Sequence, residues 1–121
     1  MSDDDLAALR RWHDAANAGD VEGAVRECAG DVSVRGPRGT GQGHQLVRDW
    51  LTRSGIRLEP LEDLGDLQDT AERDGRYVVR ERAQWTTAVS EPVETHCVFV
   101  VYDALVRSIA RYDDPAQVPP A

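Results

Sequence analysis

Lysine is absent from this sequence of 121 residues, and all 14 basic residues are arginine. Without lysine, the chain cannot form a Schiff base, anchor pyridoxal phosphate or build the phosphate-binding lysine of a P-loop. The 22 acidic residues give a formal net charge of −8. Because phosphate contacts by basic side chains provide most of the affinity for nucleic acid, we expect no nucleic-acid partner. The arginine bias is typical of a GC-rich bacterial genome.

Cysteine and histidine are also scarce. The two cysteines, Cys28 and Cys97, lie far apart and form no Cys-x-x-Cys motif, so we expect reduced, buried thiols in the cytoplasm. The three histidines, His13, His44 and His96, do not pair at the spacing of metal ligands. The sequence therefore predicts neither a metal site nor a bound cofactor.

Long hydrophobic runs are missing as well. The apolar run 97–102 is far shorter than the roughly 18 residues that a membrane span requires, and the start of the chain, 1–5, lacks the basic segment of a signal peptide. We therefore expect a cytoplasmic protein without a membrane partner. The length suits a single domain, which we place at residues 1–114 and follow with a loose tail at 115–121.

Three helices are predicted in the first half of the chain. An acidic first turn followed by apolar residues at helical spacing predicts a helix over residues 4–18. Asp20 is a good N-cap for a second helix over 21–28. A third helix has Trp50 on its buried stripe and ends at Gly55, whereas the glycine-rich segment 36–43 before it is expected to form a loop.

Strands dominate the second half. We expect a short strand at 31–35, an irregular strand from Ile56, a turn at Asp74-Gly75, and then long strands. The long strands are expected at 77–86, 93–102 and 105–112. Alternation assigns an inward orientation to two sets of residues, which are Tyr77, Val79, Glu81, Ala83 and Trp85 on the first long strand and His96, Val98, Val100 and Tyr102 on the second.

The order of these elements, together with three local signatures, resembles a known superfamily. The signatures are Ala18-Gly19-Asp20-Val21-Glu22, Gly43-His44-Gln45-Leu46-Val47-Arg48-Asp49-Trp50-Leu51 and Ile109-Ala110-Arg111-Tyr112-Asp113-Asp114. The chain is similar to the nuclear transport factor 2-like superfamily, specifically its SnoaL-like polyketide-cyclase and ketosteroid-isomerase branch. The resemblance implies an α+β cone, in which three N-terminal helices pack on a strongly curved mixed or antiparallel sheet that encloses a pocket.

This fold hosts isomerases, cyclases, dehydratases, epoxide hydrolases and non-catalytic binding proteins, so it does not give the function. Ketosteroid isomerases use an Asp base, together with a Tyr and a protonated Asp that donate hydrogen bonds to the dienolate oxygen. The corresponding positions here carry Gly36, Trp12 and Val98. We therefore expect no steroid isomerisation by that mechanism.

Polar residues whose strand parity predicts an inward orientation are the candidates for chemistry. We predict His96 and Glu81 as general base and acid, with Arg107 holding an oxyanion or carboxylate. The predicted ligand-binding residues are Trp12, Trp50, Tyr77, Val98, Val100 and Arg111. Alternatively, His96 is a core histidine, Glu81 pairs with Arg107 or Arg111 for structural reasons, and the two tryptophans belong to the core.

Two functions remain open. In the first, the pocket binds a small apolar or polyketide-like molecule and performs acid–base chemistry on it as an isomerase, cyclase or dehydratase. In the second, the protein is a non-catalytic dimeric module for ligand binding or interaction. Because the strand 93–102 is apolar on both faces, we expect a homodimer through the outer face of the sheet.

Overall fold

The computed structural model describes residues 2–36, 39–62, 75–87 and 91–119. Three helices precede most of the strands, and a short 3₁₀ helix follows the last strand. In chain order the elements are α1 (Ser2–Asn17), α2 (Val21–Arg26), β1 (Cys28–Gly36), β2 (Gly39–Gln42), α3 (His44–Ser54), β3 (Ile56–Pro60), β4 (Arg76–Trp85), β5 (Val93–Tyr102), β6 (Leu105–Tyr112) and η2 (Pro115–Gln117).

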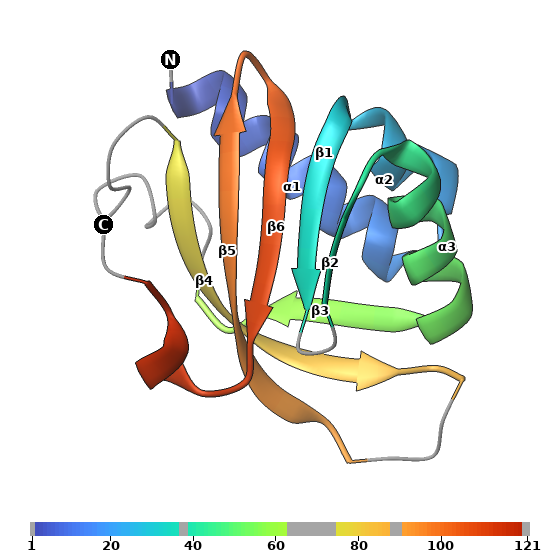
Figure 1. Ribbon diagram of the computed structural model, residues 1–121, viewed down its shortest axis with the longest axis vertical. Coiled ribbons are helices and arrows are strands. Elements are labelled where there is room, and N and C mark those ends of the chain that lie inside the picture. The colour runs from blue at the N-terminus through green and yellow to red at the C-terminus, as the bar shows by residue number, and fades with distance from the viewer. Residues whose placement is uncertain (1, 37–38, 63–74, 88–90, 120–121) are drawn as a thin grey trace.

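The six strands form one mixed sheet in the order β2-β1-β6-β5-β4-β3. β1 runs parallel to β6, and every other neighbouring pair is antiparallel. Figure 1 shows the sheet bending strongly along β4 and β5, with α1 crossing behind the central strands. The predicted fold class, an α+β cone with three N-terminal helices on a curved mixed sheet, is confirmed, and the sheet does not close on itself.

Short side-chain contacts fix the helices to the sheet. Asn17, the last residue of α1, hydrogen-bonds the backbone of Leu58 on β3 through both its amide nitrogen and its amide oxygen, at 2.8 Å each. Asp20 caps α2 by accepting from the amide of Gly23 at 3.0 Å, as the sequence predicts. The two bonds of Asn17 hold the C-terminal end of α1 against β3.

The end of α3 is tied to the end of β4 through Gly55. This glycine caps α3 in the left-handed conformation, with φ 58°, and donates to the carbonyl of Leu51. A side chain here would lie 2.1 Å from Oγ1 of Thr86, which instead donates to the Gly55 carbonyl at 3.0 Å. The contact holds the neighbouring Trp85 beside α3.

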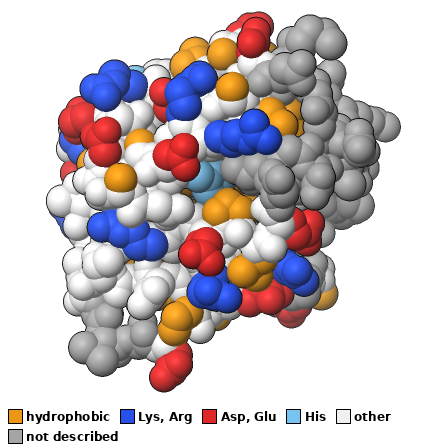
Figure 2. Space-filling view, turned by 180° about the vertical axis from the view of Figure 1, so that it is seen from behind, with side chains coloured by type: hydrophobic (Ala, Val, Ile, Leu, Met, Phe, Trp, Pro, Cys, Tyr) orange, Lys and Arg blue, Asp and Glu red, His pale blue; other side chains and the backbone are white. Residues whose placement is uncertain are grey.

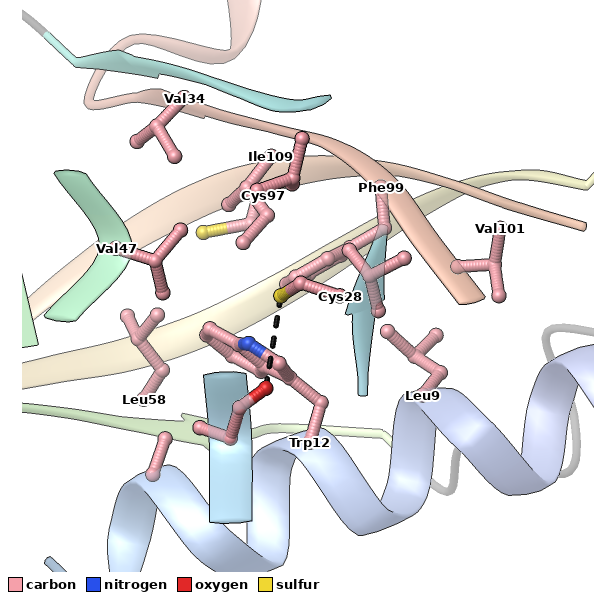
Figure 3. Close-up of a cluster of buried hydrophobic side chains, with 14 of the residues drawn as sticks. Leu9, Trp12, Cys28, Val34, Val47, Leu58, Cys97, Phe99, Val101 and Ile109 are labelled. Atoms are coloured by element: carbon pink, nitrogen blue, oxygen red, sulfur yellow. Dashed lines mark hydrogen bonds between the residues drawn. The ribbon is translucent and has the colours of Figure 1, made fainter. Parts of the chain in front are cut away.

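The hydrophobic core lies between the helices and the inner face of the sheet. Leu9 and Trp12 of α1 meet Phe99 of β5, and the three side chains are fully buried. Figure 3 shows this cluster, in which the Sγ atom of Cys28 donates to the Ala24 carbonyl at 3.5 Å. The residues of β5 that enter the core are Thr95, Cys97, Phe99 and Val101.

Two predictions about the strands are wrong. Residues 39–42, which were expected to lie in a loop, form β2 and pair with β1. The predicted inward orientation of His96, Val98, Val100 and Tyr102 is also wrong, because the alternate residues of β5 are the ones buried against the helices. Since both faces of β5 are apolar, alternation alone could not decide between the two orientations.

The surface seen from behind the view of Figure 1 carries acidic and basic side chains interspersed with small apolar patches (Figure 2). Among the side chains described on this face, neither sign of charge gathers into one large patch. None of the described helices is long and apolar enough to cross a membrane.

Candidate functional site

A cavity of about 770 Å³ opens between α3, the end of β4 and the strands β1, β2 and β6. Its volume falls within the range of small-molecule sites. Most of its surface is apolar, and two tryptophan rings contribute to it. The lining residues are Val34, Arg35, Gly36, Gly39, Thr40, Gly41, Leu46, Trp50, Ser54, Trp85, Thr87, Ile109 and Arg111.

Glycines on β1 and β2 leave one wall of the cavity without side chains. A side chain at Gly41 would lie 2.4 Å from Leu46, which packs over the strand at this point. At Gly36 the result differs, since an added Cβ atom would meet no other atom within 4 Å. The open space at Gly36 is therefore part of the cavity.

Arg111 is one of two arginines that line this apolar cavity. It lies opposite Cys97 in the β5–β6 register, on the inner face, and its side chain is only 15% exposed. The Cζ atom lies 5.4 Å from the ring centroid of Trp85, a cation–π geometry. Its Nη1 atom donates to Oδ1 of Asp113 at 2.5 Å, and the same oxygen accepts from Thr95 at 3.1 Å.

A smaller cavity of about 420 Å³ adjoins the first one. Arg35, Gly36 and Arg111 line both cavities, and the smaller one also contacts Tyr112, Asp113 and Gln117. Its surface is more polar than that of the larger cavity. Together the two cavities form a cleft that is apolar at one end and polar at the other, with Arg111 where they meet.

An ion pair between His13 and Glu81 is buried in the core behind this cleft. The Nε2 atom of His13 contacts Oε1 of Glu81, and its Nδ1 atom donates to the Leu9 carbonyl at 2.9 Å. Burial lowers the pKa of His13, but the charge and hydrogen bond of Glu81, with the Leu9 bond, outweigh burial and raise it above its ordinary value. The pair does not line either cavity.

The two thiols are buried and protonated. Burial, assisted by the negative charge of Glu81, raises the pKa of Cys97 well above its usual range. Burial also raises the pKa of Cys28 to about 12. Because the thiolate is the reactive form of cysteine, neither Cys28 nor Cys97 is suited to act as a nucleophile.

The structure does not bring the predicted catalytic residues together. His96 lies on the outer face of the sheet between Arg80 and Tyr112, and Glu81 lies on the inner face with His13 as its partner. Arg107 is displaced to the outer side by a bulge in the β5–β6 register, and its Cζ atom lies 4.6 Å from the ring centroid of Tyr102. The predicted inward orientation of Arg107 is therefore wrong, as is the predicted partner of Glu81.

The predicted ligand-binding residues divide into two groups. Trp50 and Arg111 line the cavity. The others do not, since Trp12 and Tyr77 are buried in the core and Val98 and Val100 lie on the outer face. Trp12 stacks on Trp50, with the ring centroids 6.4 Å apart, and so supports the cavity wall from behind.

Sequence reasoning did not assign a role to Arg35, Trp85 or His13. Alternation predicted an inward orientation for Trp85, and this is the signal that could have pointed to its place in the cavity lining. Arg35 was predicted as the last residue of the short strand 31–35, directly before the segment 36–43 that was expected to be a loop, so its place beside the cavity had no local signal. His13 follows Trp12 on the apolar stripe of α1, and its partner lies 68 residues away.

Among the described residues, no group of three or more histidine, cysteine, aspartate or glutamate side chains is placed to hold a metal ion. The described lining of the larger cavity contains none of these four residue types. Its chemistry is therefore that of apolar contact, ring stacking and guanidinium hydrogen bonds.

Solved structures share this architecture. An NTF2-like protein of unknown function from Cytophaga hutchinsonii superposes with a TM-score of 0.73 over 90% of this chain and 88% of that chain, at 11% identity. The fold is NTF2-like. The resemblance predicted from the sequence is therefore confirmed at the level of the fold.

Two further solved structures are similar to this chain. A candidate polyketide cyclase from Sinorhizobium meliloti has a TM-score of 0.71 and 19% identity, covering 87% of this chain and 93% of that chain. TerC, co-crystallised with polyporic acid, has a TM-score of 0.73 and 19% identity, covering 93% of both chains. No family model and no curated protein matches the sequence. At these identities, the likeness shows the fold and leaves the function to be argued from the cleft.

Proposed function

We propose that this protein binds a small apolar molecule with a planar ring system in the cavity between α3 and the curved sheet. The observation that carries the proposal is the cavity of about 770 Å³ with Trp50 on α3 and Trp85 on β4 in its lining. Tryptophan rings offer a large apolar surface to planar ligands at a low cost in side-chain entropy. The proposal is supported by TerC, a protein of similar fold that was co-crystallised with polyporic acid.

The wall at Gly36 allows a direct test of this proposal. We expect the neutral bicyclic ketone acetylnaphthalene to quench tryptophan fluorescence and to raise the melting temperature, because it stacks against the two cavity tryptophans. Gly36→Val adds a side chain into the open space of the cavity and should abolish both effects while the protein stays folded. Gly30→Val is the matched control, since Gly30 lies on the same strand with equally open surroundings and outside the cavity lining. Equal binding by both variants would contradict the proposal.

Acid–base catalysis on the bound molecule is the second candidate function. It is favoured by Asp113, the carboxylate among the described residues that line the smaller cavity. Asp113 is held by hydrogen bonds from Thr95 and Arg111, as a positioned general base would be. An isomerase, cyclase or dehydratase acting on an apolar ketone needs such a base next to an apolar cavity.

The same ketone tests for catalysis. A base at Asp113 should accelerate exchange of the methyl protons of acetylnaphthalene for deuterium in heavy water, measured by NMR. Asp113→Asn should remove the acceleration without reducing binding of the ketone. Exchange at the rate of buffer alone, in a sample in which the ketone is bound, would leave binding as the function and reject the catalytic candidate.

We also propose a homodimer through the outer face of β4, β5 and β6. Val78 and Tyr102 are 36% and 48% exposed on this face, with Val98 and Val100 among their neighbours. Exposed apolar patches of this kind mark interfaces in soluble proteins. Light scattering at micromolar concentration should give the mass of a dimer, and Val78→Asp should give that of a monomer, whereas Thr52→Asp on the exposed side of α3 should not. A monomeric mass for the unmodified protein would contradict this proposal.

A further inference from the structure

The point where the two cavities meet carries more positive than negative charge, although the whole chain has a formal net charge of −8. Arg35 and Arg111 line both cavities there, and Asp113 is the one acidic residue in the described lining of either cavity. Two guanidinium groups and one carboxylate leave a surplus of one positive charge. A surplus of one suits a monoanion.

Arg111 keeps donors available for such an anion. Its guanidinium has five N–H groups, of which the hydrogen bond from Nη1 to Asp113 uses one. The cation–π contact with Trp85 holds the guanidinium in place without using further N–H groups. Arg35 forms no ion pair with any described residue, and its Cζ atom lies 5.8 Å from the ring centroid of Tyr112. The planar fork of donors on an arginine matches a carboxylate in shape and charge.

We infer that the natural ligand is a planar apolar carboxylate, with its ring system between Trp50 and Trp85 and its carboxylate on Arg111 at the junction of the two cavities. This inference rests on the proposed binding function. Arg111 lies beside Trp85, so a ligand that stacks on the tryptophan places a carboxylate substituent next to the guanidinium. Arg35, which lines both cavities, adds to the attraction, and Asp113 competes with the ligand for Nη1 of Arg111.

The experiment compares two probes that differ at one group. Naphthoate carries a carboxylate where acetylnaphthalene carries an acetyl group of nearly the same shape, and both are titrated by calorimetry at low salt. We expect naphthoate to bind about tenfold more tightly, because charge-assisted hydrogen bonds are stronger than neutral ones. In the Arg111→Gln variant, the affinity for naphthoate should fall to that for acetylnaphthalene, and the affinity for acetylnaphthalene should not change.

Two variants serve as controls. Arg107→Gln removes an arginine from the outer side of the same strand and should change neither affinity. Asp113→Asn removes the competing carboxylate and should strengthen naphthoate binding, which gives an effect opposite in sign to that of Arg111→Gln. Thermal melting of each variant shows that it is folded.

The outcomes separate the inference from the function on which it rests. Equal affinity of the unmodified protein for both probes would overturn the carboxylate inference and leave the proposed binding function standing. If a folded Arg111→Gln variant binds neither probe, the carboxylate inference is also overturned, because Arg111 would then be needed for the shape of the cavity and not for recognition of a carboxylate. If neither probe binds, and Gly36→Val behaves like Gly30→Val, the binding function itself fails.

Discussion

His13 of α1 and Glu81 of β4 form an ion pair inside the hydrophobic core, where both side chains are almost completely shielded from water. Removing one partner leaves the other buried without compensation, which costs about 3–5 kcal/mol in other proteins. We expect His13→Leu and Glu81→Met each to lower the free energy of unfolding by about that amount. Chemical denaturation measures the change.

The double variant His13→Leu/Glu81→Met distinguishes a buried ion pair from two independent core residues. Because apolar side chains of similar size replace a buried ion pair with little loss or a gain of stability, we expect the double variant to be more stable than either single variant. If the two destabilisations simply add, then His13 and Glu81 do not act as a pair.

Stability should depend on pH through His13. Its pKa is raised in the folded protein above the ordinary value of 6.5, so folding favours the protonated imidazole. The resulting contribution is fully present below pH 6.5 and is lost as the pH rises through the raised folded value. We therefore expect the urea midpoint to fall as the pH is raised from 6.5 through the folded pKa of His13. The midpoint of the double variant should fall less over the same range. A midpoint that rises over the same range would contradict the assignment.

The two thiols should resist modification in the native state. Both Cys28 and Cys97 are buried, and both pKa values are raised, that of Cys28 to about 12. An aromatic disulfide reagent at neutral pH should label neither thiol until denaturant is added, after which it should label two per chain. Rapid labelling of one thiol without denaturant would show that the core opens near that residue.

Gly75 is expected to tolerate no side chain. It has a φ of 79°, and an added Cβ atom would lie 1.7 Å from the carbonyl oxygen of Val101, whose amide nitrogen donates to the Gly75 carbonyl. Gly75→Ala should lower the free energy of unfolding by about 2 kcal/mol or more. Gly30→Ala, where the surroundings are open, is the control and should change it by less than about 0.5 kcal/mol.

The sequence predicted the fold well because most of its signals are local. The apolar spacing of α1, the Asp20 cap and the Gly55 stop are all read from neighbouring residues, and the structure places each as expected. Residues 39–42 were missed because glycine-rich segments favour loops, whereas here pairing with β1 holds the chain extended. The turn expected at Asp74-Gly75 falls partly outside the described residues, since Asp74 is not among them.

The candidate site was harder to predict, because its geometry depends on long-range pairing. The β5–β6 register shifts at one bulge between Val100 and Val101, and this shift changes which residues of β6 face inward. As a result Arg107 lies on the outer side and Arg111 on the inner side. Strict alternation placed both arginines on one face. Likewise, the orientation of His96 depends on which apolar face of β5 meets α1, and only the three-dimensional packing decides that.

The position of β6 has a consequence for synthesis on the ribosome. This strand is the last of the sheet in the chain, yet it lies at the centre, parallel to β1 and antiparallel to β5. At the same end of the sheet, the side chain of Asp5 in α1 accepts a hydrogen bond from the amide of Ala104, which is 99 residues further along. The sheet therefore cannot be completed until β6 has left the exit tunnel, because β1 lacks one of its partner strands until then. Folding of this sheet is consequently a late event in the synthesis of the domain, because its central pairing joins segments that are far apart in the sequence.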